Sequence, residues 1–454
     1  MFRDHSASAR AVGFAGSALV AVGGLGAGAL PVGVPFFAGG GNAQAGLVGV
    51  YSGLALLLLG WWWYGRTGAD DCWRTLALWS APLLLAPPMF SRDVYSYLAQ
   101  GLMIDSGMDV YRHGPALLGG QVAEQVPAVW QHTPSPYGPV FLMVAEWVAG
   151  PHLLVGVVAM RLVAVAGLVL LAASIRVLAV SAGVSPTAAT WLAVLNPLTL
   201  IHLVAGAHND ALMVGLLAAG LAAAVRRRPI AATLLVAAAA LVKVPAALGL
   251  CAVALIWGAQ LPGRWPVARA GAAVAGTAAA ATVLLTALAG TGYGWITALG
   301  TPISAQNWSL TSALGRGTAA VLADDGVGAT VAQGVWRWAG LLATLIVAGL
   351  VWTYRSRLGP VYGLGILLVA LVAFGPALRP WYLVWGLAPL AAAAADRRVR
   401  RVLAAVCGVL VLVVLPDGFA ADPERVLLAV LGALLGGAVF LAVRLATAPA
   451  LVLR

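Results

Sequence analysis

Residues 90–101, FSRDVYSYLAQG, decide how the rest of this chain is interpreted. They follow an apolar run, 76–89, and bring an acid, a base and two tyrosines to its end. A carboxylate is costly to hold at a membrane boundary, so Asp93 is a candidate functional group. If Ser91 caps a helix, Asp93 lies in its first turn, where backbone N–H groups favour an anion, and Tyr97 shares its face. The alternative is an ordinary interfacial helix that begins at Asp93.

The composition predicts a membrane protein. Of the 454 residues, 62% are hydrophobic and 9% are charged, whereas about 25% are charged in a soluble domain. Apolar runs of about 20 residues recur from end to end. We therefore predict an all-α, polytopic transmembrane helical bundle that forms one integral membrane domain, residues 1–454. The three cysteines form no CxxC pair, so neither a disulfide framework nor a zinc site is predicted.

The apolar runs predict about fourteen spans. The first is longer than the 7–15 residues or so of a signal-peptide apolar region, so we interpret it as an uncleaved span. The pair around Lys243 is short and interrupted by Val244-Pro245, which also fits two half-spans or a re-entrant hairpin. The predicted spans are 11–34, 46–64, 74–90, 152–175, 186–204, 210–225, 229–242, 246–259, 269–289, 334–354, 360–376, 381–395, 402–415 and 425–444.

The basic residues predict the orientation. A formal charge of +11 would suggest nucleic acid in a soluble protein, but most of the 26 Lys and Arg fall in alternate loops. Cytoplasmic loops are enriched in such residues. We therefore predict a multi-pass protein of the cytoplasmic membrane with both termini cytoplasmic, surrounded by lipid and without a nucleic-acid partner.

Two long segments, 91–151 and 290–333, then lie on the extracytoplasmic side. Loops of this length in a compact protein are usually functional. Within the first loop, 93–106 and 121–130 are predicted to be short helices along the membrane surface.

Further polar clusters interrupt the hydrophobic pattern on the same side. Each has a plain alternative: a helix cap at Asp210, a snorkelling Lys243, or an aromatic-belt anchor at Arg379. Arg161 lies within a span and needs a partner, for which Glu146 is a candidate. Convergence on one side nevertheless predicts one active site built from many helices. The clusters are His208-Asn209-Asp210, Lys243, Arg379-Pro380-Trp381-Tyr382 and Asn307-Trp308-Ser309.

One leading carboxylate with several cations fits attack by a hydroxyl group and departure of a phosphate. The carboxylate would act as general base, and the cations would stabilise the leaving group. A glycosidase needs two carboxylates, an alternative that Asp105 and Asp109 keep open. No nucleotide-binding motif is present, so the sugar would arrive on a lipid. No metal-ligand spacing such as HExxH or DxD appears, so no cofactor or metal is predicted; assistance by a divalent cation is left open, although the sequence does not indicate one.

The chain resembles the polytopic GT-C superfamily glycosyltransferases that use lipid-linked sugars. Within them it is most similar to the actinobacterial polyprenol-phosphomannose-dependent α-(1→6)-mannosyltransferases of lipomannan backbone synthesis. Two or three predicted spans precede Asp93, whereas many members place the acid after the first span. The motifs that carry the resemblance are 91–97 (SRDVYSY), 109–111 (DVY), 130–139 with SPYGP at its end, 208–210 (HND) and 379–382 (RPWY).

The resemblance implies a reaction and roles for individual residues. Asp93 would be the general base, polyprenyl-phosphate-mannose the donor and a mannan or lipomannan the acceptor, with inversion to an α-(1→6) link. Expected ligands of the donor phosphate are His208, Lys243, Arg379 and Arg92. Expected substrate-binding residues are Tyr97, Tyr137, Asn209, Asp210, Trp308, Trp381 and Tyr382. Transfer of arabinofuranose or another lipid-linked sugar is the nearest alternative, and a lipid-linked-sugar transporter or flippase is a second.

Overall fold

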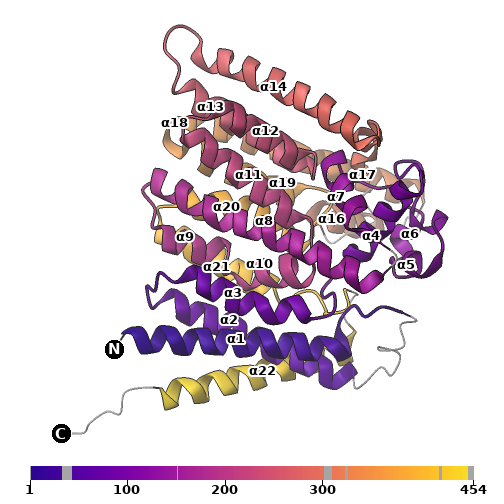
Figure 1. The fold of residues 1–454 in the computed structure, drawn as a ribbon, viewed down its shortest axis with the longest axis vertical. Helices are drawn as coiled ribbons and strands as arrows, with labels where there is room; N and C mark the ends of the chain where they lie inside the picture. The colour runs from indigo at the N-terminus through magenta and orange to yellow at the C-terminus, as the bar shows by residue number, and fades with distance from the viewer. Residues whose placement is uncertain are drawn as a thin grey trace.

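The structure is a computed structural model that describes residues 2–32, 43–150, 152–300, 309–322, 326–418 and 422–447. Within these ranges every regular element is a helix, as predicted, and the long helices lie side by side (Figure 1). These are α1 (Phe2–Ala27), α2 (Ala43–Gly65), α3 (Cys72–Leu85), α8 (Leu153–Ser181), α9 (Pro186–Ala193), α11 (Asp210–Val225), α12 (Pro229–Ala240), α13 (Leu248–Gly258), α14 (Pro266–Ala289), α17 (Val327–Thr353), α19 (Pro360–Phe374), α20 (Leu383–Ala393), α21 (Arg397–Leu410) and α22 (Pro423–Ala446).

The number of spans is smaller by a strict length criterion. Six helices in the described part of the chain are long and apolar enough to cross a membrane: α1, α2, α8, α14, α17 and α22. A seventh span results if α9 and the segment Pro197–Ala205, which meet at 46°, are counted as one. Each predicted span coincides with helix, but several of these helices have only 10–17 residues. The protein is therefore a multi-pass helical membrane protein, and the count of fourteen stays a prediction.

Helix boundaries follow from local chemistry. Proline occupies the first turn of α9, α12, α14, α19 and α22, where its missing N–H costs nothing. Asp396 and Asp422 cap α21 and α22 by accepting hydrogen bonds from the backbone N–H groups of Arg398 and Arg425. Because a proline disfavours helix in the residue before it, α3 ends ahead of Pro87.

The first long loop folds into four α-helices and a short 3₁₀ helix, η2 (Pro115–Leu117), at one edge of the molecule (Figure 1). The predicted helix 93–106 is confirmed as α4 (Asp93–Asp105), whereas 121–130 is two shorter helices, α5 (Gly120–Glu124) and α6 (Ala128–Gln131). Helix α7 (Pro139–Val148) was not predicted. Gly101 lets α4 approach α7 closely, because a Cβ at this position would collide with the carbonyl of Ala145.

The second long loop contains less structure in its described part. It holds α15 (Gly294–Thr297), η5 (Ala298–Gly300) and α16 (Leu310–Val321), and α17 begins earlier than the predicted residue 334. The predicted site residue Trp308 lies outside the described residues.

The bend after α9 places the histidine cluster. Asn196 accepts a hydrogen bond from the backbone N–H of Leu198 at 2.9 Å and begins α10 (Pro197–Thr199). The π-helix η3 (Leu200–Ala205) follows, a type of helix that occurs frequently at functional sites. The chain then turns into α11 through residues 206–209, which contain His208.

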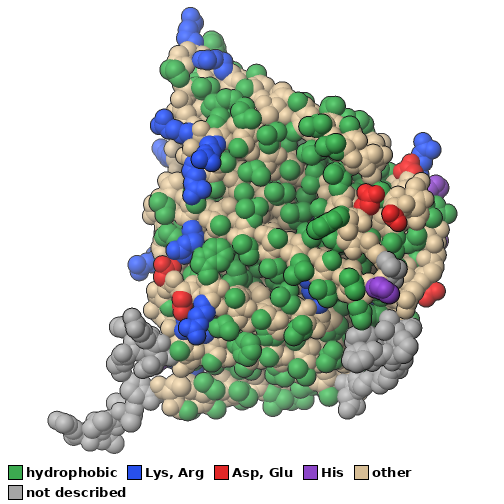
Figure 2. Space-filling view, viewed as in Figure 1, with side chains coloured by type: hydrophobic (Ala, Val, Ile, Leu, Met, Phe, Trp, Pro, Cys, Tyr) green, Lys and Arg blue, Asp and Glu red, His purple; other side chains and the backbone are tan. Residues whose placement is uncertain are grey.

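Charge is sorted between the two ends of the bundle. On the face drawn in Figure 2, Lys and Arg gather along the edge opposite α4–α6, and most Asp and Glu lie beside those helices. This is the asymmetry that oriented membrane proteins carry.

Candidate functional site

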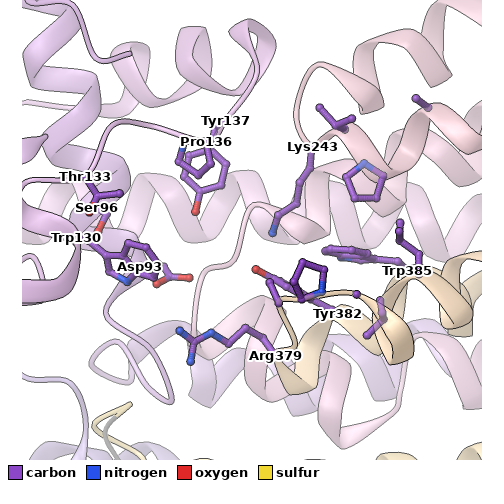
Figure 3. A pocket seen from close by; sticks show the side chains of 18 of the residues that line it. Asp93, Ser96, Trp130, Thr133, Pro136, Tyr137, Lys243, Arg379, Tyr382 and Trp385 are labelled. Atoms are coloured by element: carbon purple, nitrogen blue, oxygen red, sulfur yellow. The ribbon is translucent and has the colours of Figure 1, made fainter. Parts of the chain in front are cut away.

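A cavity of about 530 Å³ lies beside the first turn of α4 (Figure 3). Its walls come from segments far apart in the sequence, and three of the predicted site residues, Asp93, Lys243 and Arg379, meet there. The lining residues that carry the chemistry are Asp93, Ser96, Gln100, Trp130, Thr133, Tyr137, Lys243, Arg379, Tyr382 and Trp385.

Asp93 is the only carboxylate among the described residues that line this cavity. It lies in the first turn of α4, as predicted, and its backbone N–H donates to Ser91 Oγ at 3.0 Å. Its side chain is 26% exposed. Burial raises the pKa of Asp93, although the charge of Arg379 and the hydrogen bond from Ser91 lower it in part. A carboxylate with a raised pKa that still reaches a cavity is suited to accept a proton.

His208 lies behind Asp93 and outside the cavity lining. Its Nδ1 is 3.4 Å from Asp93 Oδ2 and 3.5 Å from the hydroxyl of Tyr97, so both α4 residues converge on it from one helical face. Its ring stacks on Trp381 with 4.0 Å between centroids. Burial lowers the pKa of His208 to about 3, so the imidazole is neutral at physiological pH. A buried neutral imidazole can orient the base, but the structure does not place it where it could bind a donor phosphate.

Lys243 and Asp210 form a buried ion pair. The Lys243 ammonium donates to both Asp210 oxygens at 2.9 Å, and Trp385 Nε1–H donates to Asp210 Oδ1 at 2.6 Å. Asp210 is fully buried and begins α11, so the structure places it behind the cavity wall rather than against a substrate. Lys243 itself lines the cavity, with its charge balanced by Asp210. Its nitrogen also lies 4.6 Å from the Tyr382 ring centroid.

Arg379 is the cation that remains for a ligand. Within the described part of the chain it forms no salt bridge, and its side chain lines the cavity (Figure 3). Figure 3 shows Asp93, Lys243 and Arg379 directed into the same space.

The predicted aromatic residues divide into two groups. Tyr137 and Tyr382 line the cavity, where they can contact a sugar or an apolar chain. Tyr97 and Trp381 are buried behind it, around His208. Asn209 is also buried, and neither atom of its amide has a hydrogen-bond partner among the described residues.

Two further predictions change with the structure, in addition to those for His208 and Asp210. Arg92 does not line the cavity: it donates to Leu30 O and Gln125 O, both at 3.1 Å, and so joins the end of α1 to α5. The partner proposed for Arg161 is wrong, because its guanidinium donates to backbone carbonyls rather than to Glu146. Those carbonyls belong to Leu84 in the last turn of α3, to Ala86 directly after this helix, and to Ala205 at the end of η3.

Backbone strain accompanies both halves of the acid–histidine pair. Phe90, three residues before Asp93, has φ 62°, and Ala207, next to His208, has φ 53°. Non-glycine residues rarely adopt this left-handed conformation, and such strain clusters at functional sites. Phe90 is held by a hydrogen bond from its N–H to Pro416 O, at 2.6 Å.

Among the lining residues that sequence reasoning missed, three carry a signal that could have found them; Trp130 and Thr133, which lie in the motif 130–139, were also not assigned to the site. Trp385 follows Tyr382 by three residues, a spacing that places both on one face of a helical turn and could have revealed it. The other two, Ser96 and Gln100, follow Asp93 along α4 at intervals of three and four residues and carry the same signal. In the described ranges no group of three or more His, Cys, Asp and Glu could hold a metal ion.

Comparison with known proteins gives a consistent result along the chain. Residues 10–259 match the family model described as "Alpha-(1->6)-mannopyranosyltransferase, N-terminal domain", and residues 310–442 match "MptB C-terminal domain". The chain is 34% identical to alpha-(1->6)-mannopyranosyltransferase A of Mycobacterium tuberculosis, over 90% of this chain and 84% of the relative. It is 32% identical to alpha-(1->6)-mannopyranosyltransferase B of Corynebacterium glutamicum, over 96% and 81%. No solved structure matches.

Proposed function

This chain belongs to the alpha-(1->6)-mannopyranosyltransferase family, and from that premise we propose a mechanism in which Asp93 is the general base. The enzyme is a membrane mannosyltransferase that forms α-(1→6) links, as the resemblance implied. The observation that carries the mechanism is that Asp93 is the one carboxylate among the described residues of a cavity that also holds a free cation.

The reaction is a single displacement. The C6 hydroxyl of the acceptor mannose attacks C1 of the donor mannose while the bond from C1 to the phosphate oxygen breaks. Asp93 takes the hydroxyl proton and later releases it to water, and the leaving group departs as polyprenyl phosphate. A β-linked donor thereby yields an α-linked product. The leaving phosphate needs charge stabilisation rather than a proton, so one carboxylate is sufficient.

Arg379 is the proposed ligand of the donor phosphate. Its planar guanidinium can hold two phosphate oxygens, and it forms no salt bridge with a carboxylate of the described residues, although its charge also acts on Asp93. Lys243 has a supporting role, because its ammonium is shared with Asp210 and only the remaining N–H can reach a donor.

One wall of the cavity suits a polyprenyl chain. It is formed by the segment before α13 and by the end of α19, and its side chains carry no charge. This wall supports a lipid-linked donor over a nucleotide sugar, because a prenyl chain can be buried there. The residues are Val244, Pro245, Ala247, Leu248, Leu371, Val372 and Pro376.

The proposed orientation places this cavity at the extracytoplasmic face of the cytoplasmic membrane. The acidic side chains near α4–α6 and the basic edge opposite support it (Figure 2). Both α1 and α22 have their chain-terminal ends at the basic edge, which supports cytoplasmic termini (Figure 1).

A two-carboxylate glycosidase mechanism does not fit the geometry. Asp105 is at the far end of α4, about 18 Å from Asp93 at 1.5 Å per residue, whereas inverting pairs lie about 6.5–9.5 Å apart. Asp109 pairs with Arg112 at 3.3 Å and does not line the cavity.

The test is transfer of radiolabelled mannose from synthetic polyprenyl-phosphate-mannose to a short α-(1→6)-mannoside. Membranes containing the protein are expected to form the product, and membranes without it are not. Transfer from polyprenyl-phosphate-arabinofuranose alone would overturn the proposed donor, and transfer from GDP-mannose with no lipid carrier would overturn the lipid-linked mechanism.

The rate of transfer is expected to fall on the acid side of its pH profile (the acid limb) at a higher pH than an ordinary aspartate would give. General-base catalysis requires ionised Asp93, so kcat/KM falls as pH drops through the pKa of this carboxyl. Burial raises that pKa above the ordinary value of about 3.9. A profile of kcat/KM against pH measures it, and full activity below pH 4 or so would contradict the assignment.

Replacing Arg379 by Gln is expected to weaken transfer about 10- to 100-fold, mainly through donor binding and leaving-group stabilisation. The same change should move the acid limb to higher pH, because the guanidinium charge lowers the pKa of Asp93. Arg379→Lys is the matched control and should leave the acid limb near its wild-type position. A limb that moves to lower pH in Arg379→Gln would refute this electrostatic coupling.

A further inference from the structure

A second cavity, of about 340 Å³, lies among the ends of α2, α9 and α21. Figure 1 places α9 and α21 at the edge opposite α4–α6, so this cavity is remote from Asp93. We propose that it binds a phosphate group, carried by an anionic lipid headgroup or by a small phosphorylated molecule. Its lining is Tyr64, Gly65, Gly68, Ala69, Ser185, Thr187, Ala188, Trp191, Arg397, Arg400 and Arg401.

Three arginines supply the positive charge. Arg397, Arg400 and Arg401 are spaced to share one face of α21, and all three line the cavity. Arg400 donates to Ala394 O at 2.8 Å, which fixes its position. Within the described residues, neither of the other two forms a salt bridge. Asp396 already caps the N-terminus of α21. The proposed site is therefore formed by the arginine side chains and not by the free backbone N–H groups of the helix terminus.

The neighbouring carboxylates are already engaged. Asp71 pairs with Arg10 and accepts from the Tyr64 hydroxyl at 2.7 Å. Asp70 accepts from Arg176 at 3.1 Å and from Thr187 at 2.9 Å, and these hydrogen bonds lower its pKa. The positive charge of the cavity is therefore not balanced by the acids beside it.

The floor of the cavity is preorganised. Trp191 stacks on Trp61 with 4.6 Å between ring centroids, and each indole N–H donates to the other's backbone carbonyl at 2.9 Å. Gly65 lies against the Trp191 ring, where a Cβ would collide. Ser185 Oγ accepts from the Ala188 N–H, so its own O–H remains to donate to a ligand. A rigid floor under two unpaired guanidinium groups distinguishes this cavity from a merely solvated basic surface.

The position of the cavity suggests what such a ligand would do. Tyr64 and Trp191 belong to the segment 10–259, which matches one family model, whereas α21 lies in 310–442, which matches the other. A phosphate bound to the arginines would therefore connect the two halves of the chain at the membrane boundary.

The test compares two double variants of the purified protein in nanodiscs of phosphatidylglycerol and phosphatidylcholine. Arg397→Gln/Arg401→Gln removes the unpaired cations, and Arg355→Gln/Arg357→Gln is the matched control. Arg355 and Arg357 belong to α18 (Arg355–Leu358), which does not line the cavity. Native mass spectrometry should show phosphatidylglycerol retained by wild type and control, and at least about tenfold less by the first variant. Equal retention by both variants would overturn the proposal.

Two further measurements complete the test. Wild-type protein should have a higher Tm in phosphatidylglycerol than in phosphatidylcholine, since a ligand of the folded state stabilises it. If the Tm of the wild-type protein is equal in the two lipids and does not rise when glycerol 1-phosphate is added, the proposal is overturned. This measurement needs no variant. Displacement of retained lipid by glycerol 1-phosphate supports a small phosphorylated ligand, and retention against it supports the lipid headgroup.

Discussion

Asp93→Asn is expected to lower the rate of mannosyl transfer by about 100- to 10,000-fold, the range that general-base catalysis contributes. Asparagine keeps the size of the side chain and its contact with His208 but cannot accept the acceptor proton at neutral pH. Because the change is isosteric and removes a partly buried charge, the protein should still fold. Initial rates with saturating donor, and Tm in detergent, measure the two effects separately.

Asp105→Asn is the matched control for this prediction. It removes a carboxylate from the other end of the same helix, outside the cavity, and should transfer mannose at the wild-type rate. Normal turnover by Asp93→Asn would eliminate the mechanism while leaving family membership intact. Loss of activity in both variants would indicate that α4 tolerates no change in charge.

Asp210→Leu is expected to destabilise the protein by about 3–5 kcal/mol, the cost of leaving a buried ion without its partner. It deprives the Lys243 ammonium of both acceptors, and Trp385 loses the acceptor of its indole N–H. Lys243→Met should be similarly costly, because it strands the fully buried Asp210 carboxylate. Unfolding of each variant in detergent measures these losses.

The double variant Asp210→Leu/Lys243→Met separates pairing from packing. Because both charged groups are removed, no buried charge is left without a partner, and the double variant should be more stable than either single variant. Additive losses would show that the two residues act independently and that the ion pair contributes little. If Lys243 also contacts the donor, as proposed, the rescued protein should retain a raised donor KM.

Several features could be predicted from the sequence because they depend on local patterns. Apolar runs identified the helices of the bundle, and Asp93 lies in the first turn of α4 as expected, although the cap residue of this helix is Arg92 rather than Ser91. The break around Lys243 is confirmed, since α12 ends at Ala240 and a 3₁₀ turn, η4 (Val244–Ala247), precedes α13.

Pairings between distant residues could not be predicted from these patterns. The sequence predicted that Lys243 and Asp210 lie on one side of the membrane, but not that they form an ion pair. The role of His208 likewise depends on burial, which turns an apparent cation into a neutral neighbour of Asp93. Arg92 does not line the cavity, because its side chain is directed toward α1 and α5, and its sequence position beside Asp93 does not reveal this direction.

Arg161 gives this architecture a further property. Its guanidinium joins the chain after α3, which continues to Asp93, to the end of η3, which continues to His208. The segments that carry Asp93 and His208, the proposed base and its neighbour, are therefore held together by a side chain of α8 that lies outside the cavity lining. Catalytic competence would then arise only in molecules in which α3, α8 and η3 have all docked. An incompletely assembled chain in the membrane would be unable to consume the donor, and specific activity would report the fraction of molecules that have finished folding.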